Sequence, residues 1–182
     1  MAGGKKDCAA EKAAKRLAED ETYMRQALRE AQAAFDAGET PVGCVIVRET
    51  ESGRAVIASA HNTRETDKRA SAHAEHDAIE SACLSLGGWR LTGCTLYVTL
   101  EPCPMCAGLI SAARVERVVY GAKDPKAGAY SSVLNMRSYP IYKPQVSAGV
   151  LENDCSGILR RFFFEMRTKK QKKNDPDDQK GE

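Results

Sequence analysis

Hydrophobic and polar positions along the chain follow two different spacings, which separate predicted helices from predicted strands. Apolar residues recur every three or four positions at Met24, Leu28, Ala31 and Phe35. This spacing is typical of a helix with one apolar face, and Gly38 follows as a stop signal. Elsewhere, short β-branched runs bounded by Gly, Pro or charged residues predict strands.

Five strands and three further helices are predicted after this first helix. The predicted strands are 42–47, 55–60, 95–100, 117–121 and 145–150. The first two form a hairpin across a long polar loop at 48–54. The predicted helices are 72–86 with Ser71 as N-cap and Gly87 and Gly88 as stop, a short one ending near 113, and 152–168. Because strands and helices alternate after the hairpin, we expect an α/β fold with helices on both faces of the sheet.

The two ends of the chain differ in composition from the rest. Residues 1–20 are polar and Ala-rich, and we expect a leader that is a frayed helix or disordered. Residues 169–182 run basic and then acidic with almost no apolar side chain, so they are predicted to form a disordered, charged tail. Such a tail is either solvated or in weak contact with RNA phosphates. Residues 21–168 remain as one domain of ordinary size.

Composition narrows the class of protein. The mean hydropathy of -0.46 excludes a transmembrane span, since no apolar run approaches the ~18 residues that one requires. The first 20 residues contain no apolar segment of the signal-peptide kind, so secretion is not expected. Seven Cys in such a chain favour metal binding or thiolate chemistry in the cytoplasm over a disulfide scaffold. The net charge of +2 means that any nucleic-acid surface must come from local clustering of basic residues.

Two short segments carry candidate chemistry: His73-Ala74-Glu75 and Pro102-Cys103-Pro104-Met105-Cys106. Two thiolates and one imidazole suit zinc, and three protein ligands leave the fourth position open for water, as in catalytic sites. Zinc lowers the pKa of such a water to ~7. Glu75 follows His73 at the start of a predicted helix, where the helix dipole favours a carboxylate, and it can carry a proton from water to substrate. The spacing matches the known signature of zinc-dependent base deaminases.

The alternative for this motif is a closed structural zinc site, for which His76 or Cys94 would be the fourth ligand. His76 is otherwise expected as a packed or partly solvated helix residue. Cys8 is expected as an exposed bystander in the leader. The remaining Cys lie in apolar patterns and are predicted to act as small hydrophobic residues: Cys44, Cys83, Cys94 and Cys155.

With these motifs, the sequence resembles the TadA-like tRNA adenosine deaminases of the bacterial type over about residues 22–167. The His-x-Glu and Cys motifs are common to all zinc-dependent base deaminases, whereas the longer blocks are much more specific to the tRNA branch. The resemblance rests on Pro41-Val42-Gly43, His61-Asn62, residues 72–75, residues 95–103, residues 105–108, residues 117–124, Lys126 and Gly128.

The resemblance implies a cytidine deaminase-like fold: a three-layer α/β/α arrangement around a five-stranded mixed sheet, in a homodimer. It implies hydrolytic deamination of adenosine to inosine at the wobble position of a tRNA anticodon. One Zn2+ per chain would be held by His73, Cys103 and Cys106. Glu75 would be the catalytic proton shuttle, and substrate would meet Asn62, the backbone of Ala74, and Lys123, Asp124 and Lys126 near the anticodon loop. Without that role, Asn62 would be a strand-end turn residue, and the two lysines ordinary loop charges.

The expected mechanism is attack of zinc-bound hydroxide on the purine carbon that carries the amine, with Glu75 moving the protons. One alternative is a zinc-dependent deaminase of free bases or nucleosides, of the guanine or cytosine type; the resemblance at 121–128 argues against it. Another is a non-catalytic, zinc-bearing RNA-binding subunit. Such subunits can lose the proton-shuttling Glu, and the presence of Glu75 argues against this alternative.

Three segments depart from the family pattern. Arg69-Ala70-Ser71 replaces the usual Asp-Pro-Thr, the 48–54 loop looks longer than usual, and Tyr142-Lys143-Pro144 replaces a frequent Asn-His pair. Near the C-terminus, residues 162–164 are three consecutive Phe flanked by Arg. Because consecutive rings on a helix point in different directions, at least one is expected in the core, and stacking on RNA is the alternative role.

Overall fold

One mixed β-sheet organises the structure, a computed structural model that describes residues 3–51, 53–139 and 141–173. The strand order is β2-β1-β3-β4-β5. β1 pairs antiparallel with β2 and β3, whereas β3, β4 and β5 run parallel. The strands are β1 (Gly43–Thr50), β2 (Gly53–His61), β3 (Cys94–Leu100), β4 (Arg117–Ala122) and β5 (Gln145–Ala148). This arrangement confirms the predicted five-stranded mixed sheet.

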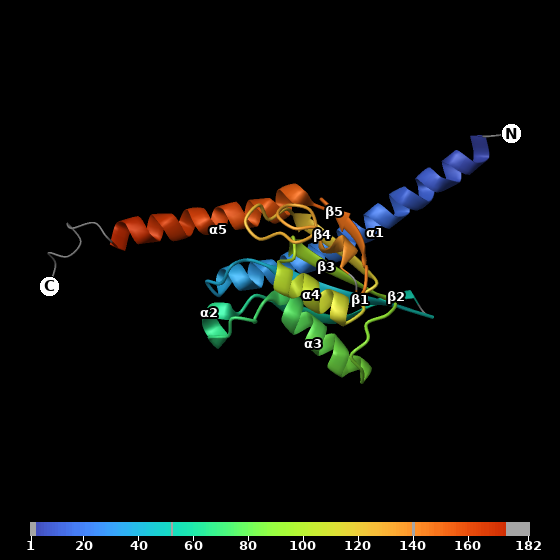
Figure 1. The fold of residues 1–182 in the computed structure, drawn as a ribbon. Helices are drawn as coiled ribbons and strands as arrows, with labels where there is room; N and C mark the ends of the chain where they lie inside the picture. Colours follow the sequence, from blue (N-terminus) through green and yellow to red (C-terminus); the bar gives the residue numbers. More distant parts are fainter. Residues whose placement is uncertain (1–2, 52, 140, 174–182) are drawn as a thin grey trace, which may run out of the picture.

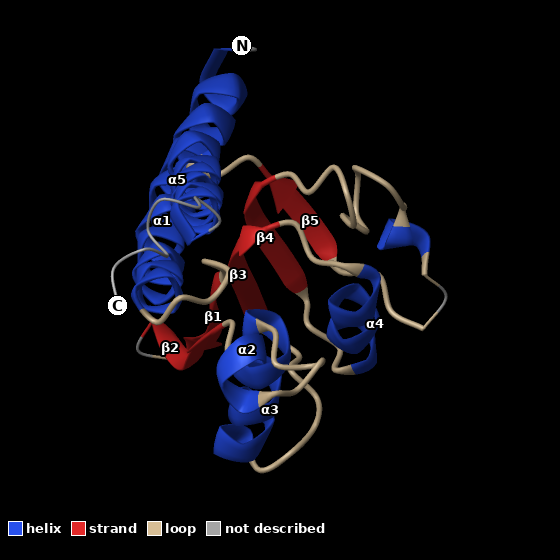
Figure 2. Cartoon of the chain, turned by 90° about the vertical axis from the view of Figure 1, so that its left-hand side faces the viewer, coloured by secondary structure: helices blue, strands red, loops and turns tan. Residues whose placement is uncertain are grey.

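Helices cover both faces of the sheet, as predicted (Figures 1 and 2). α1 (Gly3–Asp36) and α5 (Glu152–Lys173) cover one face, and α3 (Ala74–Leu86) and α4 (Pro104–Ala112) cover the other. Short helices α2 (Arg64–Asp67) and η1 (Met136–Ser138) lie in the connections. Side chains alternate along the strands, so Leu96 and Val98 of β3 pack toward α3 and α4, whereas Tyr97 packs toward α1 and α5.

Helix α1 approaches the sheet so closely that one strand position must be glycine. A Cβ atom on Gly43 would lie 2.0 Å from the carbonyl oxygen of Ala27 and 2.4 Å from the amide nitrogen of Ala31. Both are backbone atoms of α1, which cannot move aside as a flexible side chain could. Gly43 therefore allows α1 to pack directly on β1. Gly43 is the first residue of β1 and follows Val42, which lines the pocket described below.

Two local predictions from the sequence are wrong. Strands β1 and β2 pair as far as Thr50 and Gly53, so most of the expected 48–54 loop is strand. The sequence pattern of this polar stretch favours a strand only weakly, but pairing with the neighbouring strand stabilises it as one. The pairing includes a register shift between Ile46 and Val47. Ser71 does not cap α3: the N-cap is His73, in an extended conformation, and the amide of His73 donates instead to the carbonyl of Ser71.

Helices α1 and α5 extend into the segments predicted as leader and tail. α1 passes through residue 20 without a break, and Asp20 is buried. α5 continues past residue 168 to Lys173, while residues 174–182 of the expected tail lie outside the described residues. The predicted boundaries of the domain, after residue 20 and after residue 168, stay a prediction. In the ranges that the structure describes, no helix combines the length and the apolar content needed to cross a membrane.

Candidate active site

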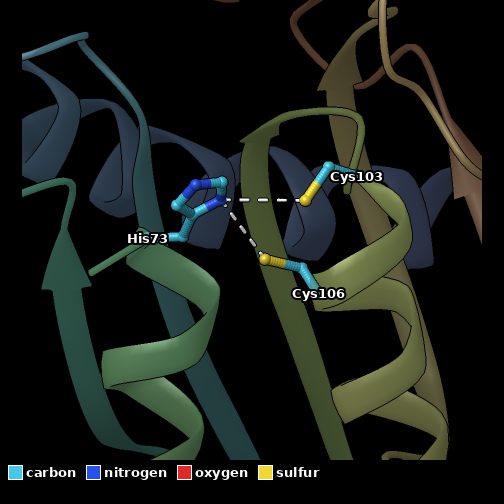
Figure 3. Close-up of side chains that lie close together, drawn as sticks. All are labelled: His73, Cys103 and Cys106. Atoms are coloured by element: carbon cyan, nitrogen blue, oxygen red, sulfur yellow. Dashed lines mark hydrogen bonds between the residues drawn. The ribbon is translucent and has the colours of Figure 1, made fainter. Parts of the chain in front are cut away.

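Three metal-ligating side chains meet where α3 and α4 begin (Figure 3). His73 is the N-cap of α3, Cys103 is the N-cap of α4, and Cys106 lies in the first turn of α4. Pro104 occupies the first turn of α4, where its fixed φ favours helix initiation. The Nδ1 atom of His73 lies 3.8 Å from Sγ of Cys103 and 3.5 Å from Sγ of Cys106.

The three donors fit a tetrahedral zinc ion. Zn–N and Zn–S bonds of about 2.1 and 2.3 Å at a tetrahedral angle separate the two donor atoms by about 3.6 Å, close to the separations seen here. All three atoms lie within 4.8 Å of one another, and they form one group to which neither His76 nor Cys94 belongs. His76 lies instead beside Asp77, and Cys94 is buried at the start of β3. Among the residues that the structure describes, no fourth protein ligand completes a closed structural site.

The protonation of this group also favours a cation. Hydrogen bonds from Cys106 and then His73 lower the pKa of the Cys103 thiol to about 4, against the opposing effect of burial. The Cys103 interaction in turn raises the pKa of His73. The same partner, together with burial, raises the pKa of Cys106. The three donor atoms thus lie close enough to share protons, and a metal ion can take the place of those protons.

Glu75 lies in the first turn of α3, two residues after the His73 cap. Its side chain is buried and lines the same pocket as His73 and Cys103. Burial raises the pKa of Glu75, although hydrogen bonding to its own backbone amide and the charge of His73 act in the opposite direction. A carboxyl with a raised pKa beside a metal-ligand group is suited to accept and return a proton.

A pocket of about 230 Å³ opens in front of these residues. It is smaller than the roughly 300–1,000 Å³ typical of sites for drug-sized ligands, so it suits a single base-sized group. Of the residues predicted from the sequence to touch substrate, three line it and two, Lys123 and Lys126, do not. The lining residues are Thr40, Val42, Asn62, Arg64, His73, Ala74, Glu75, Leu100, Glu101, Cys103, Asp124 and Ala127.

The amide of Asn62 is held in one orientation by a residue behind the pocket. Its Nδ2 donates to Oε2 of Glu39 at 3.0 Å, and Oε1 of Glu39 accepts from the backbone amide of Thr66 at 2.7 Å. A carboxylate cannot donate, so the NH2 end of the Asn62 amide must face Glu39. Burial raises the pKa of Glu39, but hydrogen bonds from the Thr66 and Glu65 amides lower it overall and keep the carboxylate charged.

A wider groove continues from the pocket. Its volume is about 900 Å³, and it shares Thr40, Leu100, Asp124 and Ala127 with the pocket. The groove runs between the segment after β4 and helix α5. Its other basic and aromatic lining residues are Lys123, Lys126, Arg160, Arg167, Phe163 and Phe164.

The three consecutive Phe residues of α5 divide as expected. Phe162 is buried, and its ring meets the edge of Phe35 on α1 at a centroid distance of 5.5 Å. Phe163 and Phe164 are 45% and 64% exposed and line the groove. This confirms that one ring belongs to the core and leaves two available on the surface.

Four Cys were predicted to act as small hydrophobic residues. Of these, Cys44, Cys94 and Cys155 are fully buried, whereas Cys83 is only partly buried. The side chain of Cys8, predicted to be exposed, lies outside the described residues.

Three charged residues of the pocket region were not predicted from the sequence: Glu39, Arg64 and Glu101. Glu39 and Glu101 are both buried although each is charged. The only feature of the sequence that could have indicated Glu39 and Glu101 is their position: each is a single acidic residue at the edge of an apolar strand segment. Such residues are rarely buried without partners, and the partners become visible only in the folded structure.

Comparison with known proteins agrees with this geometry. The family model for the cytidine and deoxycytidylate deaminase zinc-binding region matches residues 17–122. The tRNA-specific adenosine deaminase of Bacillus subtilis (strain 168) is 50% identical over 156 residues, which cover 85% of this chain and 94% of the relative.

Solved structures resemble the fold over most of its length. A structure from studies of A-to-I editing by tRNA:A34 deaminases is 44% identical with a TM-score of 0.71, covering 76% of this chain and 99% of that one. A guanine deaminase from Nitrosomonas europaea is 24% identical with a TM-score of 0.67, covering 78% and 83%, and shows the fold alone. The chain is a zinc-dependent deaminase that belongs to the tRNA-specific adenosine deaminase family.

Proposed function

We propose that this protein catalyses the hydrolytic deamination of adenosine to inosine at the wobble position of a tRNA anticodon. One observation carries the proposal: a buried carboxylate lines the same base-sized pocket as His73 and Cys103, two members of a His-Cys-Cys group able to hold one metal ion. The 50% identity to a tRNA-specific adenosine deaminase supports the choice of substrate. His73, Cys103 and Cys106 would hold the zinc ion.

Zinc bound to these ligands supplies a water molecule that loses its proton near neutral pH. Glu75 would accept this proton as the oxygen adds to the purine carbon that bears the amine. It would then give this proton to the adjacent ring nitrogen and carry the second proton, from the added hydroxyl group, to the departing amine, which leaves as ammonia. Its buried position allows these transfers because the carboxyl exchanges protons without competing solvent. Positioned acid–base groups of this kind contribute about 10²–10⁴-fold to rate.

Base recognition would come from Asn62 and the backbone of Ala74, both of which line the pocket. Glu39 holds the Asn62 amide in one orientation, so the hydrogen-bonding pattern offered to a base is defined before binding. A base can enter such a pocket only when it is out of its stack, and the single-stranded anticodon loop allows this at low cost.

The groove beside the pocket would hold the RNA around the reacting base. Lys123, Lys126, Arg160 and Arg167 bring four basic side chains to its lining, although the whole chain has a net charge of only +2. The exposed rings of Phe163 and Phe164 could stack on unpaired bases. A deaminase of free bases needs no such groove, so this feature favours the RNA substrate over that alternative.

We also propose that the protein acts in the cytoplasm as a homodimer. The described Cys residues all carry free thiols, which suits a reducing compartment. Beside the metal-ligand group, α4 and the segment that packs on it through Ser111 expose four large apolar side chains: Met105, Val133, Leu134 and Ile141. A second copy would cover this surface. Analytical ultracentrifugation should show a dimer, and Leu134→Asp should shift it toward monomer.

The function is tested by inosine formation in an anticodon stem-loop with adenosine at the wobble position. The same zinc-loaded protein is assayed beside free adenosine, guanine and cytosine, and Glu75→Ala is the control. Inosine only in the stem-loop, abolished in the variant, is the expected result. Turnover of a free base with an untouched stem-loop would overturn the tRNA assignment. RNA and zinc binding without any ammonia release would identify a non-catalytic subunit instead.

A further inference from the structure

A second buried carboxylate, Glu101, lines the pocket together with Glu75. It follows the last residue of β3 and directly precedes Pro102 and the metal-ligand candidate Cys103. Its own backbone amide donates to the carbonyl of Ala122, at the end of β4. Glu101 therefore stands between the segment that carries the metal ligands and the segment that follows β4.

The carboxylate of Glu101 is surrounded by hydrogen-bond donors from a single loop, residues 123–132. Its Oε1 accepts from the backbone amides of Tyr130 at 3.0 Å, Ser131 at 2.6 Å and Ser132 at 3.1 Å. The Ser131 hydroxyl donates to the same oxygen at 3.3 Å. Oε2 accepts from the amide of Asp124 at 3.3 Å and from the Ser132 hydroxyl. These six hydrogen bonds span almost the whole 123–132 loop.

The 123–132 loop is wrapped so tightly around this carboxylate that it needs a glycine. A Cβ atom on Gly128 would lie 2.5 Å from the carboxylate carbon of Glu101 and 2.7 Å from the carbonyl oxygen of Asp124. The loop contains no helix or strand. Besides hydrogen bonds within the loop, the amide of Ala129 donates to the carbonyl of Pro102 at 2.9 Å. The Glu101-Pro102 segment thus supplies the scaffold on which the loop is built.

The same loop shapes both places where substrate would bind. Asp124 and Ala127 line the base pocket and also the groove, and Lys123 and Lys126 line the groove. A carboxylate has about four lone-pair sites, so one that already accepts six hydrogen bonds has no acceptor capacity left for a base or a water. This distinguishes Glu101 from Glu75.

We propose that Glu101 is a positioning residue: its buried carboxylate holds the 123–132 loop in the shape that forms one wall of the base pocket and one side of the RNA groove. The consequence for activity rests on the proposed function, whereas the effect on the loop does not. Glu101 then determines how well RNA is held, and the metal ligands and Glu75 carry the chemistry.

Glu101→Gln is the main variant, because it keeps the size of the side chain but turns an NH2 group toward the loop amides. Ser132→Ala removes a single donor and serves as a milder variant in case the first folds poorly. Glu80→Gln removes a charge from an exposed position of α3 and is the matched control. Each zinc-loaded protein is compared by metal content, by hydrogen–deuterium exchange of residues 123–132, and by KM and kcat on the anticodon stem-loop.

In Glu101→Gln we expect one zinc per chain, amide exchange in the 123–132 loop at least about 10-fold faster, and KM for the stem-loop raised by about 10-fold with a smaller change in kcat. Ser132→Ala should change in the same direction but less. Glu101→Asp should recover part of the protection, and Glu80→Gln should match the unmodified protein.

Unchanged exchange in the loop would overturn the proposal, as would zinc loss that parallels the loss of activity. A fall in kcat alone would instead make Glu101 part of the chemistry. If the unmodified protein forms no inosine, the proposed function fails, while the exchange data still decide whether Glu101 holds the loop.

Discussion

The buried ion pair between Asp20 and Arg117 offers a direct test of whether the start of the domain lies before residue 20. Two nitrogens of the Arg117 guanidinium donate to the two carboxylate oxygens of Asp20, at 2.7 and 2.6 Å. The hydroxyl of Tyr97 donates to the same carboxylate at 2.9 Å. The two charged side chains are only 5% and 7% exposed. The pair joins α1 to β3 and β4 across 97 residues of chain.

Asp20→Ala would leave the Arg117 guanidinium and the Tyr97 hydroxyl buried without this acceptor. Removing one partner of a buried ion pair costs about 3–5 kcal/mol, because the other charge stays uncompensated. Domains of this kind are stable by roughly 5–15 kcal/mol, so the loss is a large fraction of the total. With a urea m-value near 2 kcal/mol/M, the midpoint of unfolding should fall by about 2 M.

The assay is equilibrium urea unfolding at one protein concentration, since association would shift the midpoint. Glu21→Ala is the matched control, because Glu21 forms an exposed pair with Arg25 on the same helix, worth only about 0.3–0.5 kcal/mol. Replacing both partners, Asp20→Leu with Arg117→Met, should recover much of the stability. If Asp20→Ala shifts the midpoint no further than Glu21→Ala, the ion pair does not anchor α1 and the reasoning is refuted.

Three further predictions follow from the same structure. After chelation and reloading with zinc, His76→Ala should bind one ion per chain and Cys106→Ala should bind none; equal metal content in the two would contradict the assigned ligand set. The pKa of Glu39 is lowered on folding, so its stabilisation is present above the unfolded value of 4.5 and is lost as pH falls through the folded value. At pH 7, Glu39→Gln should therefore lower the free energy of unfolding by about 1–3 kcal/mol. Below pH 5, acidification should lower the free energy of unfolding less in this variant than in the unmodified protein, as measured by urea unfolding at several pH values. Gly43→Ala should lower the melting temperature sharply, whereas Gly88→Ala, which has open space around the new Cβ, should leave it nearly unchanged in calorimetry.

Much of the fold could be predicted from the sequence because its elements are encoded by neighbouring residues. Four of the five predicted strands lie almost entirely within observed strands, since β-branched runs bounded by turn residues need no distant partner to be recognised. The metal-ligand group could be found for a related reason. His73 with Glu75, and Cys103 with Cys106, are each a short-range pattern whose chemistry limits how they can be used.

What only the tertiary structure decided depends on groups that are distant in sequence. Residues 48–50 and 53–54 belong to a polar stretch, and they become strand because β1 and β2 pair there. Glu39 and Glu101 look like ordinary surface charges until Asn62 and the 123–132 loop are placed against them. Burying a carboxylate is unfavourable unless donors surround it, and those donors come from segments more than 20 residues away. The sequence by itself thus determined most of the elements and the metal-binding motif. The walls of the pocket and the anchoring of α1 at Asp20 depend instead on long-range hydrogen bonds that no local pattern records.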